Sequence, residues 1–266
     1  MTNVAALADE PHIRNLAHLF SYQDGVVDAN YQLAHASFGY VDKVLTLGWN
    51  AYLFLHGSTV LVQRQAVADL AHQSDPVIAS LFLSGLASLT SSARLALFGD
   101  YLDSVALLRG AFEAAYHAEY FGYWPDEARE WERDALAPVA NARVNWDRKI
   151  LKRLMARDDP TQSRKQLYQE FSRYRVHSNV AAFPLRHASA TPGVANLGFT
   201  SAGKRNAAEA TGLRLAEVGC YLVSGLFEQY ANYLNGHDRM WPGYVELAPG
   251  LEALRSMSPR VLVFDD

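Results

Sequence analysis

The chain has 266 residues, half of them hydrophobic, and a formal net charge of −4 at pH 7. This length allows one large domain or two small ones, and the charge excludes a chain-wide positive field that would attract nucleic acid or membranes. The single cysteine, Cys220, excludes an intramolecular disulfide and indicates the reducing cytoplasm. The N-terminal sequence has neither a basic flank nor an apolar segment, so no signal peptide is expected.

The first part of the chain is predicted to be helical almost throughout. A short helix is expected over residues 11–22, and apolar residues then recur at steps of three and four from 25 to about 73. Gly48 or Gly57 is expected to break or bend this stretch, which gives either one very long helix or two in series.

A further helix is predicted over residues 77–98, because Ser-Asp before Pro76 favours a helix start. Two apolar stretches, 45–62 and 77–89, raise the question of membrane spans. The first contains Asn50, a histidine and two glycines, and the second is shorter than the roughly 20 apolar residues that a span requires. Both are therefore predicted to be buried helices, and no membrane is expected as a partner.

Residues 101–124 are predicted to form the helix around which the others pack. At 100° per residue its apolar side chains gather on one side, and the opposite side carries Asp103, Ser104 and Ala118. Arg109 lies in the middle of the apolar side, with Glu113 one turn later and His117 one turn after that. We therefore expect a core helix that carries an ion pair toward the protein interior.

Proline and glycine divide the rest of the chain. Four more helices are predicted, one that starts at Pro125 and others over about residues 139–157, 161–178 and 202–234. Residues 179–202 are expected to form an irregular loop, with a short hairpin at 194–199. The tail from residue 237 is expected to wrap the surface.

The pattern as a whole predicts an all-α fold, a multi-helix up-down bundle with long antiparallel helices. One compact domain is expected, with N-terminal helices (1–98) packed on a helical core (99–237) and a C-terminal tail (238–266). No glycine-rich phosphate loop, HExxH, paired Glu-x-x-His, cysteine cluster or GxSxG elbow occurs. Neither a metal nor a cofactor is therefore predicted.

Arg109 and Glu113 have the spacing of an i,i+4 ion pair. On an apolar face the pair either fixes the register of the helix or lines a pocket, in which a buried guanidinium suits phosphate. His117 extends the same row, as a packed ring or as a binding residue.

Residues 171–187, FSRYRVHSNVAAFPLRH, gather basic and polar side chains where a helix gives way to a loop: Arg173, Arg175, His177, Ser178 and Asn179. Histidine titrates near neutral pH and arginine can hold an oxyanion, so this group suits acid–base chemistry on a phosphodiester. The alternative is a solvated, basic helix terminus.

Charge is also segregated along the chain. Residues 143–175 hold ten Arg and Lys against four Asp and Glu, whereas residues 100–134 hold three against nine. The two blocks either face each other across the bundle or a dimer interface, or the basic block binds nucleic acid.

Two stretches together, YLDSVALLRGAFEAAYHAEYF and FSRYRVHSNV, resemble the HEPN-like helical proteins through an LLRxxxE helix and a later SxYxxHS helix end. The resemblance covers about residues 95–235 and implies a helical bundle, a homodimer and RNA chemistry. Related folds also act as non-catalytic partners in defence and toxin–antitoxin systems. HEPN ribonucleases use an Arg followed by four to six residues and a His, whereas here three residues separate Arg173 from His177 and seven separate Arg109 from His117.

The leading prediction is a protein that binds or cleaves RNA without a metal, in phage defence or stress. For cleavage, His177 would activate the 2′-hydroxyl or protonate the leaving oxygen, Arg109 or Arg173 would stabilise the phosphate charge, and Glu113 would orient Arg109. Binding is assigned to His117, Tyr120, Tyr174, Arg175, Ser178 and Asn179. Two alternatives stay open: a non-catalytic interaction module with a structural Arg109–Glu113 pair, and a small-ligand binder built on Tyr116, Tyr120 and Tyr174.

Overall fold

The structure, a computed structural model, describes residues 27, 31–32, 34–57, 76–136, 146–158, 163–175, 187–191, 194–197, 205–234, 241 and 243–257. Its helices are α3 (His35–Tyr52), the π-helix η1 (Leu53–Gly57), α6 (Pro76–Leu97), α7 (Tyr101–Tyr123), α8 (Pro125–Leu136), α9 (Trp146–Asp158), α10 (Ser163–Arg175), α12 (Arg205–Gln229), α13 (Ala231–Leu234) and α14 (Leu247–Met257). A short antiparallel hairpin is formed by β1 (His187–Thr191) and β2 (Val194–Leu197). The predicted all-α, multi-helix bundle is confirmed.

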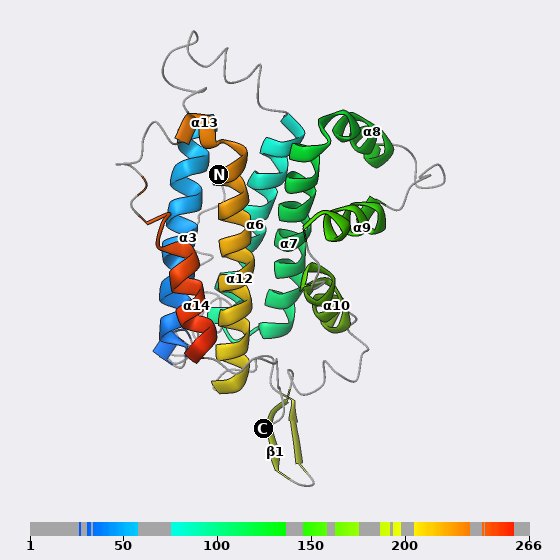
Figure 1. Cartoon of the computed structure of the whole chain (residues 1–266). Coiled ribbons are helices and arrows are strands. Elements are labelled where there is room, and N and C mark those ends of the chain that lie inside the picture. The colour runs from blue at the N-terminus through cyan, green and yellow to red at the C-terminus, as the bar shows by residue number, and fades with distance from the viewer. Residues whose placement is uncertain are drawn as a thin grey trace, which may run out of the picture.

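The long helices α3, α6, α7 and α12 run alongside one another and enclose the core (Figure 1). α6 packs along α7, and α12 contacts α3, α6 and α7. α14 packs on α3 and α12, whereas α8, α9 and α10 lie on the other side of the bundle, against α7. α7 is therefore covered by long helices on one side and by shorter ones on the other.

Gly99 builds the turn between α6 and α7. Its φ of 82° lies in the left-handed region that favours glycine. The Gly99 amide donates to the Ala96 carbonyl at 3.0 Å and the Asp100 amide to the Leu95 carbonyl at 2.9 Å, which is the Schellman pattern of a helix end. The predicted joint between the two helices is confirmed, and so is the helix start at Pro76.

Gly48 lies inside α3 and does not break it. A Cβ at this position would lie 2.8 Å from side-chain atoms of both Leu86 and Val223, so the glycine allows α6 and α12 to approach α3 closely. The change of helix type comes later, in η1, which ends at the other predicted position, Gly57. The helix expected over residues 11–22 lies outside the described part of the chain.

α7 is buried on nearly every side. Of the three residues expected to face water, only Asp103 is exposed, whereas Ser104 and Ala118 are fully buried, so that part of the prediction is wrong. The reason is the close packing of α6 on this face, where the Ser92 hydroxyl donates to the Ser104 carbonyl at 2.6 Å. The small side chains of Ser92 and Ser104 allow α6 and α7 to approach closely. The amphipathic pattern of a single helix does not predict such a contact.

The remaining helices overlap the predicted ranges, although α9 begins at Trp146 rather than near residue 139. α8 starts at Pro125, and α12 covers most of the predicted 202–234. The hairpin starts at His187, earlier than the expected 194–199, and its two strands pair Ala190 with Ala195.

The C-terminal segment, which was expected to wrap the surface, contains a helix that packs on the bundle. α14 buries Leu247, Leu251 and Leu254 on the side that faces α3 and α12. The Tyr40 hydroxyl donates to the Leu247 carbonyl at 2.7 Å. A Cβ at Gly250 would lie 2.8 Å from the Tyr40 ring, so this glycine lets the ring pack against the helix.

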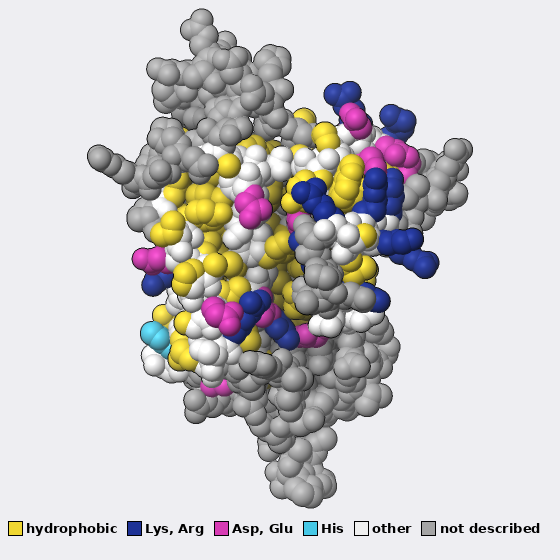
Figure 2. Space-filling model, viewed as in Figure 1, with side chains coloured by type: hydrophobic (Ala, Val, Ile, Leu, Met, Phe, Trp, Pro, Cys, Tyr) yellow, Lys and Arg dark blue, Asp and Glu magenta, His cyan; other side chains and the backbone are white. Residues whose placement is uncertain are grey.

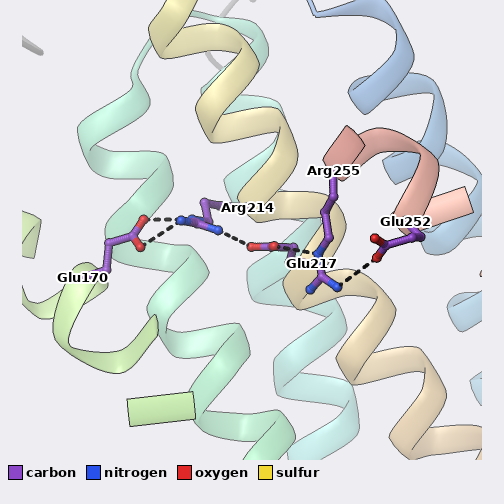
Figure 3. Close-up of polar contacts among 5 residues, drawn as sticks. All are labelled: Glu170, Arg214, Glu217, Glu252 and Arg255. Carbon is purple, nitrogen blue, oxygen red and sulfur yellow. Dashed lines mark hydrogen bonds and ion pairs between the residues drawn. The ribbon is translucent and has the colours of Figure 1, made fainter. Parts of the chain in front are cut away.

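A chain of ion pairs links α10, α12 and α14 (Figure 3). Arg214 of α12 donates to Glu170 of α10 through Nε (2.8 Å) and Nη2 (3.0 Å), and it also pairs with Glu217. Glu217 accepts from Arg255 of α14 at 3.0 Å, and Arg255 lies 3.6 Å from Glu252. Burial alone would lower the pKa of Arg214, but the two carboxylates raise it. We call these five residues the Glu–Arg chain.

Candidate functional site

Arg109 and Glu113 form the expected ion pair on α7, with Nε of Arg109 2.6 Å from Oε1 of Glu113. The side chain of Arg109 is 11% exposed and that of Glu113 is 26% exposed. A second partner comes from α10, because Nη2 of Arg109 donates to the Tyr168 hydroxyl at 2.9 Å. Burial by itself lowers the pKa of Arg109, but Glu113 and Tyr168 outweigh it, and the pKa is raised. The guanidinium therefore stays charged and joins α7 to α10.

His117, one turn further along α7, faces α9. Its Nε2 lies 3.2 Å from Oδ1 of Asp147, without the alignment of a hydrogen bond. The imidazole also packs edge-on against the rings of Tyr116, Phe121 and Trp131. The His117 imidazole, followed by Arg109, holds the pKa of Asp147 below its usual range against the effect of burial. His117 thus connects two helices from inside the core.

Tyr116 and Tyr120, two of the rings expected to form a ligand pocket, are fully buried. The Tyr120 hydroxyl donates to Oε2 of Glu127 at 2.6 Å and accepts from Nη1 of Arg153 at 2.8 Å. Burial, together with Glu127, raises the pKa of Tyr120 to about 12. Both rings belong to the packed core, and the side chain of Tyr174, the third ring, lies outside the described part.

The basic helix end predicted from the sequence is described only in part. The backbone of Arg173, Tyr174 and Arg175 forms the last turn of α10, while their side chains are outside the described atoms. His177, Ser178 and Asn179 lie outside the described residues altogether. α10 itself is fixed against α7 by Phe171, which is fully buried. The meeting of His177 with Arg109 therefore stays a prediction.

The two oppositely charged blocks meet within one chain. Glu127 of α8 pairs with Lys149 of α9 at 2.6 Å and with Arg153 of the same helix. Glu119 of α7 pairs with Arg164 of α10 at 2.9 Å. Although burial would raise the pKa of Glu127, its contacts with Lys149, Tyr120 and Arg153 hold the pKa below the usual range. Part of the charge segregation is thus explained by packing between helices.

Arg148, Lys152 and Arg157 extend the basic block at exposed positions of α9. Five cations lie on one half of the circumference of this helix: Arg148, Lys149, Lys152, Arg153 and Arg157. The guanidinium carbon of Arg153 lies 4.6 Å from the centre of the Trp124 ring, and that of Arg157 lies 3.1 Å from the centre of the Tyr123 ring. Figure 2 shows Lys and Arg gathered on the side where α8, α9 and α10 lie, with acidic side chains among them. We call these five cations the α9 basic face.

A polar cavity of about 360 Å³ lies between α7, α10 and α12, and it was not predicted from the sequence. Its lining consists of Ala115, Glu119, Tyr123, Arg164, Tyr221, Ser224, Gly225 and Glu228. Arg164 Nη2 contacts both oxygens of Glu119, at 2.9 and 3.3 Å, and the Tyr221 hydroxyl donates to the same carboxylate. The steps of three and four between Tyr221, Ser224 and Glu228 place these side chains on one face of α12, but the sequence does not show which residues of α7 and α10 lie opposite.

Within the described residues, no group of three or more His, Cys, Asp or Glu side chains is placed to hold a metal ion. One described helix, α6, is long and apolar enough to cross a membrane by length and composition. In this fold it packs against α3, α7 and α12.

Comparisons of the chain with models of known protein families, with curated proteins and with solved structures find no match in any of the three. The resemblance to HEPN-like proteins therefore stays a prediction.

Proposed function

We propose that this protein binds RNA through the α9 basic face. The observation that carries the proposal is the combination of closely spaced cations with exposed or half-buried aromatic rings, Tyr123 and Trp124, directly beneath two of them. Lys and Arg neutralise backbone phosphates, and aromatic rings stack with unpaired bases. The two HEPN-like sequence stretches support RNA as the nucleic acid.

The arrangement of charges favours modest, salt-sensitive binding. Lys149 and Arg153 share the Glu127 carboxylate, which reduces the net charge of the face. Arg148, Lys152 and Arg157 are exposed, and interactions of exposed charges are screened over about 10 Å in 0.1 M salt. Binding is therefore expected at low salt and should weaken steeply as salt rises.

Arg109 has a positioning role in this proposal. Its guanidinium is held by Glu113 and Tyr168, so it fixes α10 against α7. α10 leads in sequence to His177, the residue to which we assign any cleavage of the bound RNA, by proton transfer at the 2′-hydroxyl or the leaving oxygen.

The test of RNA binding is a charge-reversal experiment read by fluorescence anisotropy with a labelled single-stranded RNA. Arg148→Glu/Lys152→Glu is expected to weaken binding about tenfold or more, because it removes two phosphate contacts and adds repulsion. Lys43→Glu/Arg94→Glu is the matched control, at exposed cations on α3 and α6. Equal weakening by both pairs, or no weakening by the α9 pair at an unchanged melting temperature, would contradict the proposal.

Cleavage is read separately, on gels of the same RNA. If the protein cuts, His177→Ala should abolish cutting and leave binding in place. A second candidate function, a non-catalytic interaction module, is favoured by the contacts of Arg109 with Glu113 and Tyr168, which give it a structural role. Absence of any RNA binding by the unmodified protein would leave that module as the better proposal.

A further inference from the structure

The polar cavity between α7, α10 and α12 lies directly beside the α9 basic face. Tyr123 connects the two, because it lines the cavity and its ring is covered by Arg157 of the α9 basic face. Arg164, shortly after the end of α9 in sequence, lines the cavity as well. An RNA strand that lies along the α9 basic face therefore passes the cavity.

The size and walls of the cavity suit one nucleobase. Its volume of about 360 Å³ is near the lower end of the roughly 300–1,000 Å³ range of ligand pockets. The Tyr123 ring, 38% exposed, offers a surface for stacking. Glu119 is held on both oxygens by Arg164 and by the Tyr221 hydroxyl, so this wall is already ordered before a ligand arrives.

Glu228 is the residue of the lining that can distinguish one base from another. It is the exposed carboxylate of the lining, and a carboxylate only accepts hydrogen bonds, through two neighbouring oxygens. Guanine presents two adjacent donors on its Watson–Crick edge, N1–H and the N2 amino group. Adenine and cytosine present a donor beside an acceptor, and uracil presents one donor between two acceptors.

We propose that this cavity binds a guanine base of a single-stranded RNA held on the α9 basic face, with Glu228 as the specificity-determining residue. The inference rests on the proposed RNA binding and adds a base preference to it. The phosphates contact α9, the base stacks on Tyr123, and its donor edge pairs with the Glu228 carboxylate.

The experiment compares labelled oligouridine RNAs that contain a single guanine, adenine or cytosine, or no substitution. Anisotropy titrations of the unmodified protein should show about tenfold tighter binding of the guanine-containing RNA, the discrimination typical of one bidentate base contact. Glu228→Gln should reduce this ratio toward one, because an amide oxygen pairs with only one of the two donors. The experiment compares the ratio of the affinity for the guanine-containing RNA to the affinity for the other RNAs. The absolute affinities are not compared, because the loss of a negative charge raises the affinity for every RNA alike.

Glu252→Gln, at an exposed glutamate on α14, is the matched control and should keep the full ratio. Equal affinity for all four RNAs, or an unchanged ratio in Glu228→Gln, overturns the guanine inference while RNA binding itself stands. Failure of the unmodified protein to bind any of them overturns both proposals. Melting curves confirm that both variants are folded.

Discussion

At the scale of single residues, Arg109 shows how a charge is held inside the bundle. The guanidinium has exchanged water for Glu113 on its own helix and for the Tyr168 hydroxyl on α10. A buried pair adds little net stability over an apolar one, yet each partner depends on the other, because a lone buried charge is costly. This asymmetry can be measured.

Arg109→Ala is expected to lower the free energy of unfolding by about 3 kcal/mol, because it leaves Glu113 without its partner in a mostly buried place. The double variant Arg109→Met/Glu113→Leu should recover most of that loss, since it removes both charges and keeps the volume. Urea unfolding followed by circular dichroism measures both. A double variant no more stable than the single one would show that the loss comes from the Arg109 contact with Tyr168 of α10 rather than from an unpaired Glu113.

Asp147 gives the protein an acid-sensitive contact. Its pKa is lowered in the folded state by His117 and then by Arg109, so its contribution to stability is present above the unfolded pKa of about 3.9. That contribution is lost as pH falls through the folded value. Asp147→Asn should therefore lower the melting temperature near neutral pH, and the gap from the unmodified protein should narrow as pH falls below about 4.

The control for this pH dependence is Asp42→Asn, at an exposed aspartate on α3. Its melting temperature should follow that of the unmodified protein across the same range. If the difference in melting temperature between Asp147→Asn and the unmodified protein stayed constant down to strongly acidic pH, the ionised Asp147 carboxylate would not be the source of that stability.

The sequence predicts the Arg109–Glu113 pair because the two residues share one helix and a spacing of four. It does not predict Tyr168 or Asp147 as partners, because those contacts depend on how α9 and α10 cross α7. His117 could be placed on the inner side of its helix, but only tertiary packing sets its distance of 3.2 Å from Asp147.

At the scale of the elements, the Glu–Arg chain couples α10 and α14 to the central helix α12 (Figure 3). Its two arginines differ in burial, since the side chain of Arg214 is 14% exposed and that of Arg255 is 48% exposed. Arg214→Met should destabilise the protein by about 3 kcal/mol, because Glu170 and Glu217 lose a partner in a mostly buried place. Arg255→Met should cost less than about 1 kcal/mol, as expected for an exposed pair.

Chemical unfolding of the two variants side by side tests this difference in burial. Similar losses for both would mean that the Glu–Arg chain acts as one network rather than as a buried pair with an exposed extension.

Helices were predictable as elements wherever proline, glycine and apolar spacing agree, as at Pro76, Gly99 and Pro125. The burial of α7 on nearly every side was not predictable, because one helix does not reveal how many neighbours cover it. Gly48 was ambiguous for a related reason: a glycine that breaks a helix and one that admits a neighbouring helix look the same in sequence.

At the scale of the whole molecule, a net charge of −4 conceals an uneven distribution. Glu127 and Glu119 pair with part of the basic block inside the fold, and Arg148, Lys152 and Arg157 of the α9 basic face are exposed. The sequence allowed two interpretations: the acidic and basic blocks contact each other, or the basic block binds nucleic acid. The ion pairs between helices show the first for part of the basic block, and RNA binding is proposed for the rest. Binding of RNA by the remaining cations would be electrostatic, so the dependence of RNA affinity on salt concentration tests it.

RNA binding should weaken linearly on a plot of log affinity against log salt concentration, with a slope of about −0.7 per phosphate neutralised on a single strand. Lys152→Gln should make the slope shallower by about 0.7, and Arg148→Gln/Lys152→Gln by about 1.4, because each removes one phosphate contact. Glu228→Gln should change the preference for guanine and should not make the slope shallower, because its contact is with a base and not with a phosphate. Anisotropy titrations over a series of salt concentrations give all three slopes, and a slope that the α9 variants leave unchanged would place the phosphate contacts elsewhere on the protein.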